Sequence, residues 1–212
     1  MVASPAAAAE RTWPVASFSR LRVEGPVAVE VATGSPRAQA TADDRTTLAR
    51  MTVQLDGETL LVRLPDTADA PRARVVLATP RLTALLHRGI GDVAVARLTG
   101  ERVDVASTGG GAVSVAGVDA PMLAATLVGE GELKLAGRAA RARLALNGPG
   151  LLDAASLVVD ETDVSLVGDG ELRGAARYGA RVRAVGKGRV AVTGPMPCGV
   201  RASGGATVAC GK

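Results

Sequence analysis

The chain has 212 residues and a formal net charge of +4, with hydrophobic residues at 47% of positions but aromatic residues at only 1%. Because Val, Leu and Ala supply nearly all of the apolar volume, the composition favours thin repeated layers of small aliphatic side chains over a globule with an aromatic core. The 26 glycines and 11 prolines exceed what a helical protein tolerates. No apolar run reaches the length of a membrane-spanning helix, so we expect no membrane span.

The basic residues are mostly arginines, and acidic residues are interleaved with them along the chain. Nucleic-acid-binding proteins cluster their basic residues and often add aromatic side chains on which bases stack. Neither feature is evident in the sequence, so we expect no nucleic-acid partner.

The first ten residues, MVASPAAAAE, have the small side chains of a signal-peptide cleavage region but no charged start and no apolar core. Three interpretations remain open: the tail of a signal peptide, a misassigned start, and an ordinary disordered terminus. We assign residues 1–14 to a signal-peptide remnant or disordered N-terminus, outside the fold, and residues 15–212 to one domain.

From residue 89 onward, a pair of glycines flanking one residue recurs every 18 to 20 residues, and a degenerate last copy begins at Gly204. The segments VGEGELKL and VGDGELRG, which begin at Val128 and Val167, are two nearly identical copies. Apolar residues lie two apart on both sides of each pair, which is the period of a β-strand and not of a helix. The predicted corner glycines are Gly89, Gly91, Gly109, Gly111, Gly129, Gly131, Gly148, Gly150, Gly168, Gly170, Gly186 and Gly188.

Units of this length, made of short strands and glycine corners, predict an all-β fold: a right-handed parallel β-helix, or solenoid, in which each unit is one rung. Equivalent strands of successive rungs then pair about 4.8 Å apart, so equivalent residues form columns. We expect each corner to need a positive φ or a close backbone approach, which glycine allows. The left-handed form normally has a hexapeptide period, and the sequence has none.

The first third of the domain, residues 15–88, is less regular than residues 89–212. Residues 25–31 repeat the corner-and-strand pattern, residues 50–64 predict two strands joined by a hairpin turn at Asp56 and Gly57, and residues 75–78 predict another strand. Residues 65–72 read as a polar loop between prolines. We interpret residues 15–88 as irregular rungs that close the N-terminal end, with a separate small β-domain as the alternative.

Two sets of charged residues fall into columns. Lys134, Asp153 and Arg173 occupy the same outward position on three successive rungs, which predicts a ladder of alternating charges. Such a ladder is either a charged binding face or a solvated surface, and solvated pairs are the commoner case. Four acids gather at the corners and are the candidates if the chain is a carbohydrate-active enzyme: Glu130, Glu132, Asp169 and Glu171.

We assign no catalytic residue, no metal ligand and no cofactor. The sugar-stacking aromatics of a glycosidase cleft are missing from the repeat apart from Tyr178, so we interpret the corner acids as solvated. The single histidine, His87, lacks a Cys, Asp or Glu at metal-ligand spacing. The glycine pairs lack the Lys-Ser/Thr of a phosphate-binding loop and open no helix.

Cys198 and Cys210, the only cysteines, lie on the last two rungs. An even number of cysteines at one end of a solenoid favours a disulfide that closes the terminal rung, and two buried reduced thiols are the alternative.

Residues 18–34, FSRLRVEGPVAVEVATG, followed by LDGETLLVRL, TPRLTALLHRGIGDV, successive glycine corners and the closing CGVRASGGATVACG, resemble the auto-transporter adhesin, head GIN domain family. The resemblance spans about residues 18–211. It departs from the common Gly-Ser-Gly or Gly-Ala-Gly corners at Glu130, Pro149, Asp169 and Lys187. It implies a secreted, periplasmic or envelope-attached bacterial β-helix without established enzymatic activity.

We therefore expect a non-enzymatic module of the cell envelope, periplasmic or extracellular, that binds an envelope or surface ligand, either a polysaccharide or a protein. A carbohydrate-active enzyme and a scaffold that assembles end to end are the alternatives. Neither the ligand nor the binding face follows from the sequence.

Overall fold

The computed structural model describes residues 9–65 and 73–211. The assignments of residues 1–8 to a signal-peptide remnant and of most of residues 65–72 to a loop lie outside the described residues. The one helix in the described part of the chain is α1 (Arg45–Arg50). The strands are β1 (Ala9–Trp13), β2 (Arg20–Glu24), β3 (Val27–Thr33), β4 (Arg37–Ala42), β5 (Thr52–Asp56), β6 (Thr59–Arg63), β7 (Ala73–Thr79), β8 (Ala84–Arg88), β9 (Val93–Val95), β10 (Leu98–Thr99), β11 (Arg102–Thr108), β12 (Ala112–Val128), β13 (Glu132–Asn147), β14 (Leu151–Val167), β15 (Glu171–Ala175), β16 (Gly179–Val185), β17 (Arg189–Thr193), β18 (Cys198–Ser203) and β19 (Thr207–Cys210).

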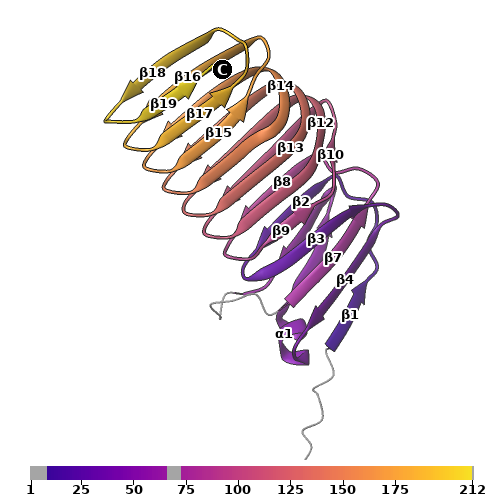
Figure 1. The fold of residues 1–212 in the computed structure, drawn as a ribbon. Helices are drawn as coiled ribbons and strands as arrows, with labels where there is room; N and C mark the ends of the chain where they lie inside the picture. Colours follow the sequence, from indigo (N-terminus) through magenta and orange to yellow (C-terminus); the bar gives the residue numbers. More distant parts are fainter. Residues whose placement is uncertain (1–8, 66–72, 212) are drawn as a thin grey trace, which may run out of the picture.

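The strands stack as a parallel β-solenoid, which confirms the predicted fold (Figure 1). Along one side, which we call the first face, β8, β11, the C-terminal parts of β12, β13 and β14, and then β16 and β18 pair in parallel. Along the second face, β9, the N-terminal parts of β12, β13 and β14, and then β15, β17 and β19 pair in the same way. Strand β10 and the middles of β12, β13 and β14 form a short third side. The right-handed sense of the coil stays a prediction.

The core is a set of inward columns of aliphatic side chains. Val113, Leu133 and Leu172 belong to one column that the sequence predicted, and each is at most 1% exposed. Because every rung buries the same side chains against those of the next rung, about 25 cal/mol of stabilisation per Å² of apolar surface is gained repeatedly along the stack. This repetition replaces the large aromatic core of a compact globule.

The N-terminal rungs are stacked out of sequence order. Strand β2 lies between β6 and β8, and β3 lies between β7 and β9, all in parallel. The rung made of β6 and β7 is therefore outermost, although its residues follow β2 and β3 along the chain. The N–H of Gly25 accordingly donates to the carbonyl oxygen of Arg88 at 2.9 Å, far away in the sequence.

An antiparallel cap covers the N-terminal end of the second face (Figure 1). Strand β4 pairs with β7, and β1 pairs with β4, both antiparallel. The prediction that residues 1–14 lie outside the fold is therefore wrong for Ala9–Trp13. Pairing with β4 supplies the backbone hydrogen bonds of β1, and Ala9 and Trp13 pack partly buried against the core.

The predicted hairpin in residues 50–64 is confirmed by the antiparallel pair of β5 and β6. Asp56 and Thr59 are the last paired residues, so the two-residue loop consists of Gly57 and Glu58. Gly57 has a φ of 56°, the positive value that such tight turns require.

Candidate functional site

The glycine corners hold successive rungs too close together for any other side chain. Gly148 has a φ of 125°, and a Cβ on it would lie 2.7 Å from the carbonyl oxygen of Gly129 in the neighbouring rung. A Cβ on Gly150 would lie 2.5 Å from the carbonyl oxygen of Gly131. The first glycine of this pair thus needs a positive φ, and the second needs a close backbone approach. Both glycines therefore have a structural role, and only the residue between them offers a side chain to a ligand.

The four corner acids line one groove with a volume of about 470 Å³, together with Lys187 and Arg189. The register places Glu132 and Glu171 two rungs apart, on either side of Leu151. Two rungs of about 4.8 Å give a separation near 10 Å between equivalent backbone positions. The structure therefore brings Glu130, Glu132, Asp169 and Glu171 to one edge of the solenoid, as the sequence suggested.

Neighbouring donors already engage three of these carboxylates. Glu132 forms an ion pair with Lys134 at 2.7 Å, and Glu171 forms one with Arg173 at 2.8 Å. The carboxylate of Asp169 accepts a hydrogen bond from the backbone N–H of Lys187 at 3.1 Å. These contacts resemble the surface ion pairs of a solvated edge more than the facing acid and base of a glycosidase.

The predicted ladder exists in register but only partly in contact. Lys134 lies opposite Asp153, and Asp153 lies opposite Arg173, on successive strands of the second face. Arg173 reaches Asp153 at 3.8 Å, whereas the ion pair of Lys134 is with Glu132 of its own strand. The cations of this ladder are therefore paired within the second face, which leaves little free charge for a ligand.

The first face carries a group of arginines that our sequence analysis missed. We call it the arginine face. Equivalent residues pair across β13, β14, β16 and β18, so these side chains point outward from adjacent rungs. All of them are exposed, and the acids among them are Glu161 and Asp163. The arginine face consists of Arg141, Arg143, Arg181, Arg183 and Arg201.

These arginines occupy positions three, five and seven residues before a corner glycine. The inward columns alternate with them, two and four residues before the same glycine, so the alternation of the strands already contained the signal. The surplus of positive charge was not evident in the sequence because acids are interleaved with the arginines along the chain. In the fold, most of those acids lie on other sides of the solenoid.

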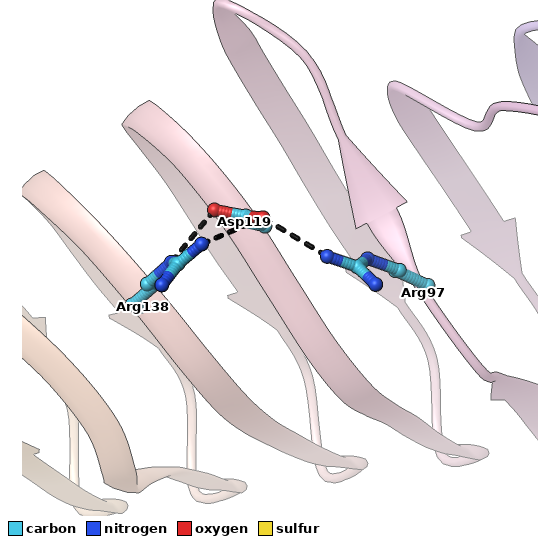
Figure 2. A network of polar contacts seen from close by, with 3 residues as sticks. All are labelled: Arg97, Asp119 and Arg138. Carbon is cyan, nitrogen blue, oxygen red and sulfur yellow. Dashed lines mark hydrogen bonds and ion pairs between the residues drawn. The ribbon is translucent and has the colours of Figure 1, made fainter.

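The third side carries a network of exposed ion pairs, in which Asp119 lies between two arginines (Figure 2). Its carboxylate accepts hydrogen bonds from Arg138 at 2.8 Å and from Arg97 at 3.0 Å. These hydrogen bonds, first from Arg138 and then from Arg97, hold the pKa of Asp119 below its ordinary value, and the same carboxylate raises the pKa of Arg138. The network links three adjacent rungs and pairs two arginines with one carboxylate, which leaves one positive charge in excess.

His87 lies inside the solenoid and is fully buried. Its partner is Ser107 on the next rung, whose hydroxyl lies 3.0 Å from the imidazole Nδ1. Because neither side chain reaches solvent, the pair has no access to a substrate and serves packing inside the coil.

Cys198 and Cys210 form a disulfide with a Cα–Cα distance of 6.3 Å, which confirms the predicted bond. It joins β18 to β19 and so closes the last rung between the two faces.

Within residues 9–65 and 73–211, no group of three or more His, Cys, Asp or Glu side chains is arranged to hold a metal ion. Among the same residues, no helix is long and apolar enough to cross a membrane.

Stacked parallel coils, glycine corners and an end rung closed by a disulfide define a β-solenoid with charged outer flanks. The chain belongs to the family described as "Putative auto-transporter adhesin, head GIN domain", whose model matches residues 17–195. No curated protein matches the chain.

Solved structures of three bacterial proteins share the fold. A putative adhesin from Bacteroides fragilis is 22% identical, with a TM-score of 0.83 over 96% of this chain and 95% of that one. A putative lipid binding protein from Parabacteroides distasonis is 16% identical, with a TM-score of 0.76 over 97% of each chain. A putative adhesin from Parabacteroides merdae is 16% identical, with a TM-score of 0.76 over 97% of this chain and 96% of that one. At these identities, the likeness establishes the fold alone.

Proposed function

We propose that the chain is a non-enzymatic binding module of the cell envelope, periplasmic or extracellular, that presents a flank of its solenoid to a polysaccharide or protein on a surface. The observation that carries the proposal is the group of exposed arginines on the first face, most of which form no ion pair within the described residues, whereas Lys134, Arg138 and Arg173 on the other sides do. The family description and the names of two of the related structures, which call them adhesins, support it.

The disulfide supports an envelope location. Disulfides form and persist in oxidising compartments such as the periplasm and the extracellular space, and they are rare in the reducing cytosol. The Cys198–Cys210 bond closes an end rung whose strands are mostly exposed.

A carbohydrate-active enzyme is the second candidate, and the corner groove is the observation that favours it. Glycosidases need an acid and a second carboxylate on opposite sides of one glycosidic bond. The groove offers Glu130 and Asp169 on the corners of rungs that lie two steps apart, with Glu132 and Glu171 beside them.

Purified protein incubated with fractionated envelope polysaccharides separates these functions. The binding module is expected to be retained on at least one fraction and to release no soluble oligosaccharide. Release that disappears when Glu130, Glu132, Asp169 and Glu171 are all replaced by their amides would establish the enzyme instead. Sedimentation showing a polymer that grows with protein concentration would instead support the end-to-end scaffold.

A further inference from the structure

We infer that the arginine face binds a linear acidic polysaccharide through the carboxylates along its length. This inference rests on the proposed function and deepens it, because it names the face and the class of ligand. Like charges lie close together on this face, and the protein supplies few carboxylates to compensate them.

Two of the arginines are stacked directly on one another. Arg183 of β16 and Arg201 of β18 are register partners on parallel strands, which lie about 4.8 Å apart. Like charges at opposed positions of a sheet destabilise it. Arg181, also on β16, places a third guanidinium group beside this pair. An anion bound between these groups would remove the repulsion.

The carboxylates nearby neutralise only a small part of this charge. Arg181 forms an ion pair with Asp163 at 3.5 Å. Within the described residues, the other members of the arginine face, Arg141, Arg143, Arg183 and Arg201, form no ion pair. Elsewhere on the solenoid, arginines such as Arg138 and Arg173 have carboxylate partners at 2.8 Å. Four guanidinium groups without an ion pair in the described part of the chain therefore lie on neighbouring strands of this face.

The shape of the face suits an extended ligand. Arg143, Arg181, Arg183 and Arg201 line a shallow groove of about 580 Å³ that runs across β13, β14, β16 and β18. Gly199, which has no side chain, leaves the groove open between Arg181 and the end of the solenoid. Arg183 and Arg201 lie on adjacent rungs, so a polymer lying along the solenoid axis can place successive carboxylates against them. Asp163 of β14 lies between Arg143 and Arg181 in register, so the polymer would reach Arg143 only past this acid.

Guanidinium groups bind carboxylates through two parallel hydrogen bonds, which gives both strength and orientation. The edge of the face near the corners carries exposed valines, Val167 and Val185, which can contact the C–H surfaces of sugar rings. No described aromatic side chain lies on these strands to stack on nucleic-acid bases. The valines are also too short to anchor the face in a bilayer, as the Trp, Phe and Leu side chains of interfacial helices do.

The test measures retention of the full chain on immobilised polygalacturonate, with neutral dextran as the uncharged control. We expect retention on polygalacturonate alone, weakening as NaCl is raised because the contacts are ionic. The triple variant R181Q/R183Q/R201Q should bind at least ~10-fold more weakly. The triple variant R37Q/R45Q/R50Q makes the same change of net charge on exposed residues of the N-terminal cap, and it should bind within ~2-fold of the native chain. Circular dichroism establishes that both variants are folded.

Three results would overturn the inference: unchanged binding by the arginine-face variant, equal losses in both variants, or equal binding of the native chain to duplex DNA or to phosphatidylglycerol vesicles. Retention on envelope fractions without retention on polygalacturonate would also overturn it, while the proposed function would stand. If no envelope fraction retains the chain, the proposed function itself fails.

Discussion

The imidazole of His87 lies 3.0 Å from the hydroxyl of Ser107, and the two side chains are the polar members of an inward column that continues with Leu127, Leu146 and Leu166. Both residues are at most 1% exposed. Within the described residues, Nε2 of His87 has no hydrogen-bond partner. Burial lowers the pKa of His87, and the nearby charge of Asp92 opposes this only in part.

The free energy of unfolding should therefore depend on pH through His87. In the unfolded chain the imidazole titrates near its ordinary pKa of about 6.5, whereas in the folded chain it stays neutral to a lower pH. As pH falls below about 6.5, the unfolded chain binds more protons than the folded chain, so stability falls until the folded pKa is passed. Urea unfolding at several pH values between 7.5 and 5.5 measures this slope.

The matched control is the double variant H87L/S107A, which continues the apolar column and leaves no unpaired hydroxyl. Its stability should change less over the same pH range than that of the native chain. Equal slopes in the two proteins would show that folding does not lower the pKa of His87.

Replacement of a corner glycine should be far more costly than replacement of a glycine at the start of a strand. In G148A the new Cβ would lie 2.7 Å from a carbonyl oxygen, at a φ of 125°. We expect a loss of at least about 2 kcal/mol of stability from this strain. In G179A nothing lies within 4 Å of the new Cβ, so the change should stay within about 0.5 kcal/mol. Thermal unfolding compares the two variants, and similar melting temperatures would contradict a steric role for the corner.

The regular part of the fold was predictable because each rung repeats the same local sequence pattern. Alternation of apolar residues around a glycine pair specifies that the side chains of Val113 and Leu133 face inward. Parallel stacking then follows for every later rung. The order of the first rungs depends instead on which strands pair among segments that are far apart in the sequence. Leu21 pairs with both Leu60 and Leu85, and nothing local in these similar strands determines which rung lies outermost.

The N-terminal strand escaped prediction for a related reason. Residues 9–13, AERTW, lack an alternating pattern, and they form a strand because the edge of β4 offers them hydrogen-bonding partners. The candidate site was only partly predictable. Columns follow from the repeat, so Lys134, Asp153 and Arg173 could be placed, but which charges neutralise one another depends on side-chain directions such as that of Lys134 toward Glu132.

Asp119 should titrate below its ordinary range, and Arg138 should be the main cause. The hydrogen bonds from Arg138, and then from Arg97, stabilise the ionised carboxylate. The stabilisation contributed by the ionised carboxylate is present above the pKa of Asp119 in the unfolded chain. It is lost as pH falls through the lower pKa of Asp119 in the folded chain. R138Q should raise the pKa of Asp119 more than R97Q does. Carbon-detected NMR titration of the carboxylate measures both shifts.

R177Q is the control for Asp119, because Arg177 and Asp119 line one groove on the third side of the solenoid, and Arg177 forms no hydrogen bond with this carboxylate. It should leave the pKa of Asp119 nearly unchanged. A similar rise in all three variants would mean that general positive charge, rather than the two hydrogen bonds, sets the pKa.

Loss of the disulfide should loosen the C-terminal end of the solenoid before the rest. The bond closes a loop between residues 12 apart in sequence, for which chain entropy predicts about 3 kcal/mol of stabilisation. In the described structure, β18 pairs only with β16, and β19 pairs only with β17, so nothing stacks on their outer edges. In C198S/C210S, hydrogen exchange should therefore speed up in β18 and β19, while β12 and β13 keep their protection.

Full native protection of β18 and β19 in that variant would contradict a closing role for the bond. Uniform loss of protection through β12 and β13 would contradict the local effect instead, because it would mean that the end rung and the centre unfold as one unit. The position of the bond favours the local outcome. Each rung contacts only its neighbours, so the cost of an open last rung falls mainly on β16 and β17, whose outer edges it protects.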